Sequence, residues 1–488
     1  MTRFWPRNEP DKPIDIAFPL FRHLSYFFEP SVTASPPSSS CVTKTKRRRM
    51  ILMNRYDAAV IGGGLSGLIA AVLLARANKS VVVLEKSERI GGRAMTIDKK
   101  GALFNLGGHA LYRGGEAHSI LQELGVRLKG GKPLADGFAL WQNRLLPLPG
   151  DPVRLLASRL LTWSGKIELG RAMLRIGKIR TADLPDISLR EWAEREIRDP
   201  MVRHLLYALC RTATYNKDID IQPIGPVMRQ IQRSLKEGVL YLNGGWQTIV
   251  DQLREMAVRA GATVMTGKSV AEIRHDGAVR GIRCADGAAI EVDGVISTLS
   301  PADTYRLVRD AERTALRRWK EAARPVKAAC LDLCLRKLPV PDRHFAIGID
   351  QPVFFTHHSR VARLSRDATL VMHLIKYNDG AESDPKADET MLESTMDLLH
   401  PGWRNEVAAK QYLPNMTVVH DVVRVGRKDA PGPAVPEIGG LYVAGDWVTR
   451  GEMLADAAAA SAERAVRELL QSSPAVRTDA VRPLTKWG

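Results

Sequence analysis

The sequence of 488 residues predicts an α/β fold in which one largely parallel sheet is assembled from three separate segments of the chain. Three observations predict it. A short β-prone run, Tyr56–Ile61, leads through a glycine-rich turn into an Ala- and Leu-rich stretch. Strand-like runs joined by Asp-Gly turns occupy residues 262–298. The apolar run Leu441–Ala444 precedes an Ala-rich helical pattern that ends near Leu469.

The first segment has the order strand, glycine-rich turn, helix, strand and acidic residue. Gly62 permits the tight turn, Gly64 lets the backbone approach a pyrophosphate, and Gly67 lets the helix pack closely on the strand. The second strand, Ser80–Leu84, ends at Glu85, whose carboxylate can accept hydrogen bonds from a ribose diol. The helix N-terminus offers free N–H groups to phosphates. This order predicts a Rossmann-type dinucleotide-binding unit.

The residues after this unit indicate the kind of dinucleotide. Arg89-Ile-Gly-Gly-Arg93, followed by the segment 104–112 (FNLGGHALY), resembles the flavin-dependent amine oxidase and phytoene (carotenoid) desaturase superfamily. The resemblance extends from about Asp57 to Leu470, with gaps in the middle, and implies FAD as the cofactor. It also implies that the Gly-Gly-Arg loop lies along the FAD diphosphate, where the Arg93 guanidinium can donate charge-assisted hydrogen bonds.

Two later segments complete the flavin site that the resemblance implies. In the segment 440–447 (GLYVAGDW), Asp446 is expected to bond the ribityl chain of FAD. The following helix starts near Met453 and points its positive end at the flavin, which favours hydride acceptance. In the middle segment, the backbone of Val270 is expected to pair with adenine.

The predicted cofactor-binding residues come from all three segments. FAD is expected to be non-covalent, because no cysteine follows Cys334 and a thioether link from the C-terminal segment is impossible. The predicted residues are Gly62, Gly64, Leu65, Ser66, Gly67, Glu85, Lys86, Gly92, Arg93, Gly108, Val270, Gly445, Asp446, Met453 and Leu454.

Two residues are candidates for catalysis. His109 lies in a segment that runs beside the isoalloxazine in the family, so it is either a base, proton relay or ring hydrogen-bond donor, or a structural histidine. Lys327 lies in a strand resembling the one that carries the flavin-N5 lysine of amine oxidases; the alternative is a solvated strand-end lysine. The segment from Arg450 to Leu454 (RGEML) lacks the aromatic residue of amine oxidases, which favours the desaturase-like branch.

These segments predict two interleaved domains. We expect a Rossmann-type FAD-binding domain in three discontinuous segments, interleaved with a substrate domain that combines a mixed sheet with helices. The boundaries are 1–52 (a disordered leader), 53–150, 236–300 and 431–470 (the FAD domain), 151–235 (the helical substrate or membrane-facing part), 301–430 (the substrate-domain sheet) and 471–488 (a tail).

Composition excludes several classes of protein. Five cysteines without a CxxC pair exclude a disulfide scaffold, argue against a structural zinc site and fit a reducing, cytoplasmic compartment. The uncharged run Ala58–Ala75 contains the glycine-rich turn, so no transmembrane helix is expected. No metal or nucleic-acid partner is expected.

Lys and Arg (71) exceed Asp and Glu (54) by 17, and the segment 151–180 interleaves basic with apolar residues. This segment is either a basic amphipathic surface for peripheral contact with an anionic membrane, or a solvated helix face.

The predicted function is that of an FAD-dependent dehydrogenase or desaturase. It transfers hydride from an apolar, polyisoprenoid-like substrate to flavin N5, and a quinone or oxygen reoxidises the flavin. The first alternative is a soluble FAD amine oxidase that releases hydrogen peroxide. The second is a flavoprotein whose redox site has become a binding module.

Overall fold

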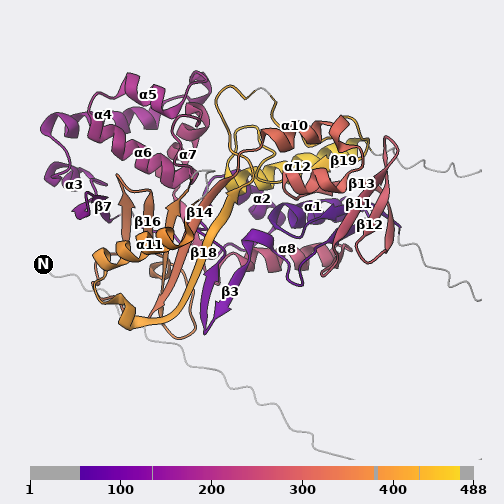
Figure 1. The fold of residues 1–488 in the computed structure, drawn as a ribbon, viewed down its shortest axis with the longest axis horizontal. Coiled ribbons are helices and arrows are strands. Elements are labelled where there is room, and N and C mark those ends of the chain that lie inside the picture. Colours follow the sequence, from indigo (N-terminus) through magenta and orange to yellow (C-terminus); the bar gives the residue numbers. More distant parts are fainter. Residues whose placement is uncertain (1–54, 135, 379–382, 428, 473–488) are drawn as a thin grey trace, which may run out of the picture. The chain divides into compact units, whose positions relative to one another are not determined.

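The computed structural model describes residues 55–134, 136–378, 383–427 and 429–472 (Figure 1). The predicted leader, residues 1–52, lies outside the described residues, as does the predicted tail from residue 473 onward. The part described contains two seven-stranded sheets, each with helices packed on it.

The first sheet is assembled from the three segments that the sequence analysis assigns to one domain. Strands β10, β2, β1, β13 and β19 run parallel in that order, and β12 and β11 continue antiparallel from the first part of β13. Asp-Gly turns join β11 to β12 and β12 to β13, as predicted. The bounds are β1 (Arg55–Ile61), β2 (Val81–Leu84), β10 (Thr263–Met265), β11 (Val270–His275), β12 (Val279–Cys284), β13 (Ala289–Ser297) and β19 (Leu441–Val443).

Apolar residues on both faces of this sheet explain its position in the core. Ala58 and Val60 of β1 pack against helices on one face, whereas Ala59 and Ile61 pack against a second cluster on the other. The first face carries α1 (Leu65–Arg76), α2 (Glu116–Leu124), α8 (Gln247–Arg259) and α12 (Leu454–Ser472). The cluster on the second face includes residues of α10 (Ala315–Ala322), against which α9 (Pro301–Leu307) packs.

The second sheet is mixed, and its order is β18-β14-β17-β16-β15-β7-β8. All its pairings are antiparallel except β15 with β7. Its bounds are β7 (Phe138–Trp141), β8 (Arg144–Pro147), β14 (Val326–Leu335), β15 (Phe345–Gly348), β16 (Val353–His357), β17 (Leu370–Tyr377) and β18 (Val407–Val419). Helix α11 (Pro385–Leu399) covers one face, through contacts with Leu331 and Leu333 of β14.

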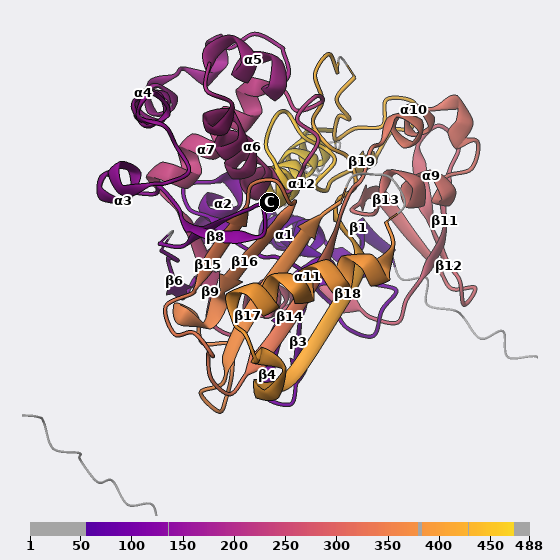
Figure 2. The ribbon, with the colours of Figure 1, turned by 60° about the vertical axis from the view of Figure 1, so that its left-hand side comes forward.

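A layer of five helices covers part of the other face of the second sheet (Figures 1 and 2). Ala328 and Cys330 of β14 alternate with the residues that face α11, and they pack against this layer. Its helices are α3 (Pro152–Ala157), α4 (Trp163–Lys178), α5 (Leu189–Glu196), α6 (Pro200–Thr214) and α7 (Ile224–Lys236).

The interleaved α/β architecture predicted from the sequence is confirmed, with one difference in a boundary. Residues 138–147 form β7 and β8 in the second sheet, although the sequence analysis places them in the FAD domain. Their partner β15 lies about 200 residues later in the chain, so no local pattern indicates this pairing.

The remaining strands are short and connect the two sheets. They form one two-stranded and one three-stranded unit: β3 (Thr96–Lys99) with β4 (Ala102–Asn105), and β5 (Leu111–Tyr112), β9 (Val239–Leu242) and β6 (Gly130–Gly131). Within the described residues, every helix is too short or too polar to cross a membrane.

Candidate functional site

A cavity of about 590 Å³ lies where the predicted flavin-binding segments meet. The ends of β1 and β2, the loop before α1, the start of β11 and the start of α12 all contribute to its wall. Of the predicted residues, the following line it: Gly62, Gly64, Leu65, Ser66, Glu85, Lys86, Gly92, Arg93, Gly108, His109, Val270, Gly445, Asp446 and Leu454.

Backbone atoms of the glycine-rich loop, without side chains, line one part of this cavity. Gly64 precedes α1, and no side chain caps the free N–H groups of that helix. A Cβ at Gly64 or at Gly92 would meet no neighbouring atom closer than 3.6 Å, because both glycines face the cavity. Gly67 does not line the cavity; a Cβ there would lie 1.9 Å from the Gly62 carbonyl oxygen, so this glycine permits close packing of α1.

Glu85 holds the loop from the end of β2. Its side chain is buried, and its two carboxylate oxygens accept hydrogen bonds from the backbone N–H groups of Gly63 (2.8 Å) and Ser87 (2.9 Å). A carboxylate oxygen has two lone pairs, so each can accept a further hydrogen bond from a hydroxyl group in the cavity.

Arg93 and Asp446 meet on the opposite part of the wall. The Arg93 guanidinium donates to the Asp446 carboxylate at 2.5 Å, and the backbone N–H of His420 donates to the other oxygen. Arg93 also donates to the Val418 carbonyl oxygen at 2.8 Å. Burial alone would raise the pKa of Asp446, but the charge of Arg93 and the bonds from His420 lower it well below its usual value. Asp446 is therefore an anion at neutral pH.

A group of neutral side chains lines another part of the cavity, around Gly108. His109 Nδ1 donates to the Gly107 carbonyl oxygen at 2.8 Å, and its ring contacts that of Trp246 edge to face. Burial lowers the pKa of His109 to about 4, so this imidazole is neutral at pH 7. Tyr215 has a positive φ of 60° at the end of α6 and donates its hydroxyl to the Gly108 carbonyl oxygen at 2.7 Å.

A buried polar network lies behind Gly108. His373 Nδ1 donates to Asp332 at 2.6 Å, and the amide of Gln411 donates to the same carboxylate at 3.0 Å. His373 Nε2 has no hydrogen-bond partner among the described residues, and it faces Gly108 from the second sheet. This network packs against the loop between β4 and β5 that carries His109, because a Cβ at Gly108 would lie 2.7 Å from His373 Nε2.

Two predicted residues lie elsewhere. Met453 does not line the cavity and packs with the cluster of the helical layer. Lys327 also does not line it; it is half-buried in β14, opposite Thr417 of β18.

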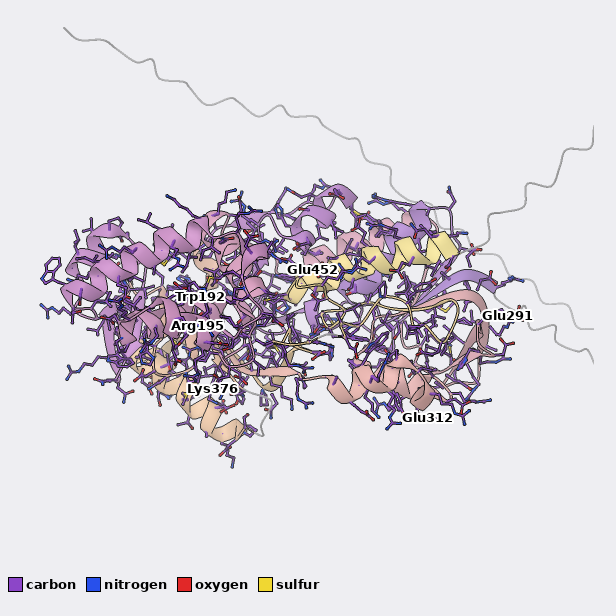
Figure 3. The ribbon with its side chains drawn as sticks, turned by 90° about the horizontal axis from the view of Figure 1, so that it is seen from above. Trp192, Arg195, Glu291, Glu312, Lys376 and Glu452 are labelled. Carbon is purple, nitrogen blue, oxygen red and sulfur yellow. The ribbon has the colours of Figure 1, made fainter. Side chains whose placement is uncertain are left out.

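Two residues near the start of α12 are also outside the cavity wall. Arg450 is exposed. Glu452, labelled in Figure 3 near the start of the yellow helix α12, forms an ion pair with Arg464 at 2.7 Å.

Sequence reasoning missed several residues of the wall. His420, Trp246, Met416 and Thr298 all line it, and Tyr215 was assigned only to the helical part of the substrate domain. Trp246 directly follows Gly244 and Gly245, a sequence pattern that could have indicated it. His420 and Met416 had no local signal, because they reach the cavity through β18 and the loop after it.

Comparison with known proteins identifies the family. The family described as flavin-containing amine oxidoreductase matches residues 65–329, which is more than half of the chain. The chain belongs to this family. It is therefore an FAD-dependent oxidoreductase of the amine oxidase family, and FAD is the cofactor that its cavity has to fit.

The individual relatives cover different shares of the chain. Protoporphyrinogen oxidase 1 of Arabidopsis thaliana is 28% identical over 160 residues, which are 32% of this chain and 29% of the plant protein. Protoporphyrinogen oxidase of Bos taurus is 26% identical over 334 residues, which are 59% of this chain and 68% of the bovine protein. The chain thus spans less than a third of the plant relative.

A solved structure of an oxidoreductase from Methanosarcina mazei matches with a TM-score of 0.67 and 21% identity. The match covers 85% of this chain and 99% of the archaeal one. At this identity the likeness shows the fold alone.

The residues present fit FAD. Gly64 and Gly92 leave room where a side chain would fill the cavity, and Glu85 presents a buried carboxylate for hydroxyl groups. Trp246 lines the cavity with its side chain only 4% exposed, and its buried indole N–H has no partner among the described residues. A buried donor without a partner is costly, and a cofactor or substrate acceptor would remove that cost.

Proposed function

We propose that the protein is an FAD-dependent dehydrogenase, resembling phytoene desaturases, that takes a hydride from an uncharged, polyisoprenoid-like substrate. One observation carries the proposal. The carboxylates that line the cavity are Glu85, Asp303 and Asp446, and each is already held by backbone N–H groups or by an arginine. Among the described residues that line the cavity around His109 and Tyr215, none carries a carboxylate that could bind an ammonium group.

The cations of the wall point to the same class of substrate. Of the lysines and arginines in the wall, Arg93 is paired with Asp446, Lys268 with Asp286, and Arg306 with Asp303, whereas Lys86, next to Glu85, is exposed. A substrate with propionate or phosphate groups would have to compete with these carboxylates. Around Gly108, the wall consists of Leu106, Ala110, Met416 and neutral aromatic rings, which suits an apolar chain.

In this proposal the residues of the chain hold and orient the reactants. Glu85 would bind ribose hydroxyl groups, the N-terminus of α1 and Arg93 would hold the diphosphate, and Asp446 would hold the ribityl chain. FAD, when bound, supplies the hydride acceptor. Neutral His109 can accept a proton at Nε2, because its Nδ1 already donates to Gly107. Tyr215 fixes the Gly108 carbonyl, which orients the segment carrying His109.

We also propose that FAD is bound without a covalent link. The four cysteines in the described part of the chain are buried, and none lines the cavity. Precipitation of the purified protein with acid is expected to release all the flavin into the supernatant. Flavin retained in the pellet would contradict this part of the proposal.

The relatives favour a second candidate, a porphyrinogen oxidase, since both curated relatives described above are protoporphyrinogen oxidases. The family description favours a third, an amine oxidase. Anaerobic reduction of the bound flavin separates the three. Phytoene in micelles is expected to bleach the flavin absorbance, whereas protoporphyrinogen IX and putrescine leave it unchanged. Bleaching by protoporphyrinogen or putrescine alone would overturn the proposal in favour of that candidate.

The proposed electron acceptor is a quinone or oxygen. After anaerobic reduction, the flavin absorbance should return on addition of menadione or of air. A flavin that neither reagent reoxidises would contradict turnover by this route and would favour a binding module instead.

A further inference from the structure

Exposed apolar side chains are concentrated on two helices of the helical layer, α3 and α4. Among the described residues, eight large hydrophobic side chains are exposed, and five of them belong to α3 and α4. These five are 55% to 77% exposed: Val153, Leu156, Trp163, Ile167 and Leu174. We call them the α3–α4 patch. Such a concentration on two helices is typical of an interaction surface rather than of scattered surface residues.

Helix α4 is apolar on two opposite faces. Leu169 and Ile176 are buried against the helical layer. Trp163, Ile167 and Leu174 are separated by four and seven positions, so they form a second stripe that points to solvent. A helix that only had to cover the core would not need this outer stripe.

Basic residues lie beside the outer stripe. Lys166 lies over the Trp163 ring at 4.5 Å and is on one side of the stripe. Arg171 and Lys178 lie on the other side, and neither forms an ion pair with any described residue. These charges are therefore free to face an anionic partner.

The helix that presents the patch is held in place. Thr162 caps it by accepting a hydrogen bond from the Gly165 N–H at 3.1 Å. Glu168 accepts hydrogen bonds from the backbone N–H groups of Arg198 and Asp199, both at 2.7 Å. Figures 1 and 2 show α3 and α4 at the edge of the helical layer, with α6 and α7 between α4 and the second sheet.

We propose that the α3–α4 patch docks the protein onto an anionic lipid surface. The apolar stripe fits the acyl boundary, and the flanking lysine and arginine side chains fit the phosphate head groups. An amphipathic helix lying in the plane of the interface satisfies both sets of side chains at once. This contact is peripheral, in agreement with described helices that are too short or too polar to span a bilayer.

Sedimentation of the flavin-loaded protein with vesicles tests the apolar part of the proposal. The protein should bind vesicles containing about 30% phosphatidylglycerol in phosphatidylcholine more tightly than pure phosphatidylcholine vesicles. Ile167→Gln with Leu174→Gln should weaken binding about tenfold. The matched control, Leu134→Gln with Val258→Gln, changes two exposed apolar residues elsewhere and should bind as the unmodified protein does. Equal binding by both double variants would overturn the proposal.

The charged part is tested in the same way. Arg171→Gln with Lys178→Gln should weaken binding to the anionic vesicles about tenfold, as about 0.5 M NaCl should. Arg254→Gln with Arg318→Gln removes two exposed charges from other helices and should have no such effect. Flavin content and thermal stability should be unchanged in all four double variants, which shows that the fold is intact.

A second copy of the chain is the competing occupant. If the protein ignores anionic vesicles but elutes as a dimer that Ile167→Gln with Leu174→Gln converts to a monomer, the lipid proposal is wrong. Vesicle binding is measured without substrate, so its failure and the failure of the proposed reaction are separate results.

Discussion

The Arg93 guanidinium and the buried Asp446 carboxylate are joined at 2.5 Å, although 353 positions separate them in the chain. This pair joins the Gly-Gly-Arg loop after β2 to the turn between β19 and α12. Side-chain exposure is 41% for Arg93 and 4% for Asp446, so the anion is enclosed while the cation reaches the cavity. The pair therefore holds two of the predicted flavin-binding segments together.

Asp446→Asn is expected to weaken FAD binding about tenfold or more, because a charge-assisted hydrogen bond is replaced by a neutral one. Titration of the flavin-free protein with FAD, followed by flavin fluorescence, measures the change. Asp293→Asn is the control, since Asp293 pairs with Arg55 on the surface and both side chains are more than 60% exposed. FAD affinity in Asp446→Asn equal to that of the control would contradict this role.

Gly64→Val should impair FAD binding, whereas Gly67→Ala should impair the stability of the fold. Gly64 has extended backbone angles and faces the cavity, so valine should fold normally but exclude FAD. A Cβ at Gly67 collides with the Gly62 carbonyl, so alanine should lower the free energy of unfolding by about 1–3 kcal/mol. Flavin content and thermal melting report the two effects. Gly170→Ala, which adds a Cβ in open space, is the control. Normal flavin content in Gly64→Val would contradict the assignment of Gly64 to the FAD site.

Lys327→Met should leave flavin reduction within about twofold of the unmodified rate, because Lys327 does not line the cavity. Stopped-flow reduction with the active substrate measures this. His109→Gln is the informative comparison and should slow the same step. A large loss of rate in Lys327→Met alone would restore the lysine as a catalytic residue.

Stability should fall as the pH falls below about 6.5. Burial lowers the pKa of His109 and of His400 to about 4, so the folded protein resists a proton that the unfolded chain accepts. Above pH 7 neither state binds this proton and no stability is lost. At pH 5 the loss is about 2 kcal/mol for each histidine.

Thermal melting between pH 5 and 8 measures this dependence. His109→Gln and His400→Gln should each make the fall in melting temperature shallower. Profiles as steep as that of the unmodified protein would show that these imidazoles are protonated in the folded state.

Local patterns predicted much of the fold, and long-range pairing decided the rest. The strand at Tyr56–Ile61 and the helix after the glycine turn carry their own signals, and both are present. Residues 289–297 form one continuous strand, β13, because β1, β12 and β19 all pair with it.

In the candidate site, too, some residues carry a local sequence signal and others depend on long-range contacts. Glycines and acids at fixed spacing indicated residues that line the cavity. The partner of Arg93 and the roles of Tyr215 and His420 depend on contacts between distant segments, which spacing does not encode. Leu454 has a φ of 57°, a left-handed conformation that leucine rarely adopts. No sequence pattern predicts this conformation.

An experimental structure of the FAD-loaded protein tests the central claim most directly. The claim predicts one FAD per chain, with a ribose hydroxyl within about 3 Å of the Glu85 carboxylate and the ribityl chain at the same distance from Asp446. An FAD bound elsewhere, or one that contacts Glu85 but leaves Asp446 and Arg93 paired only with each other, would contradict it.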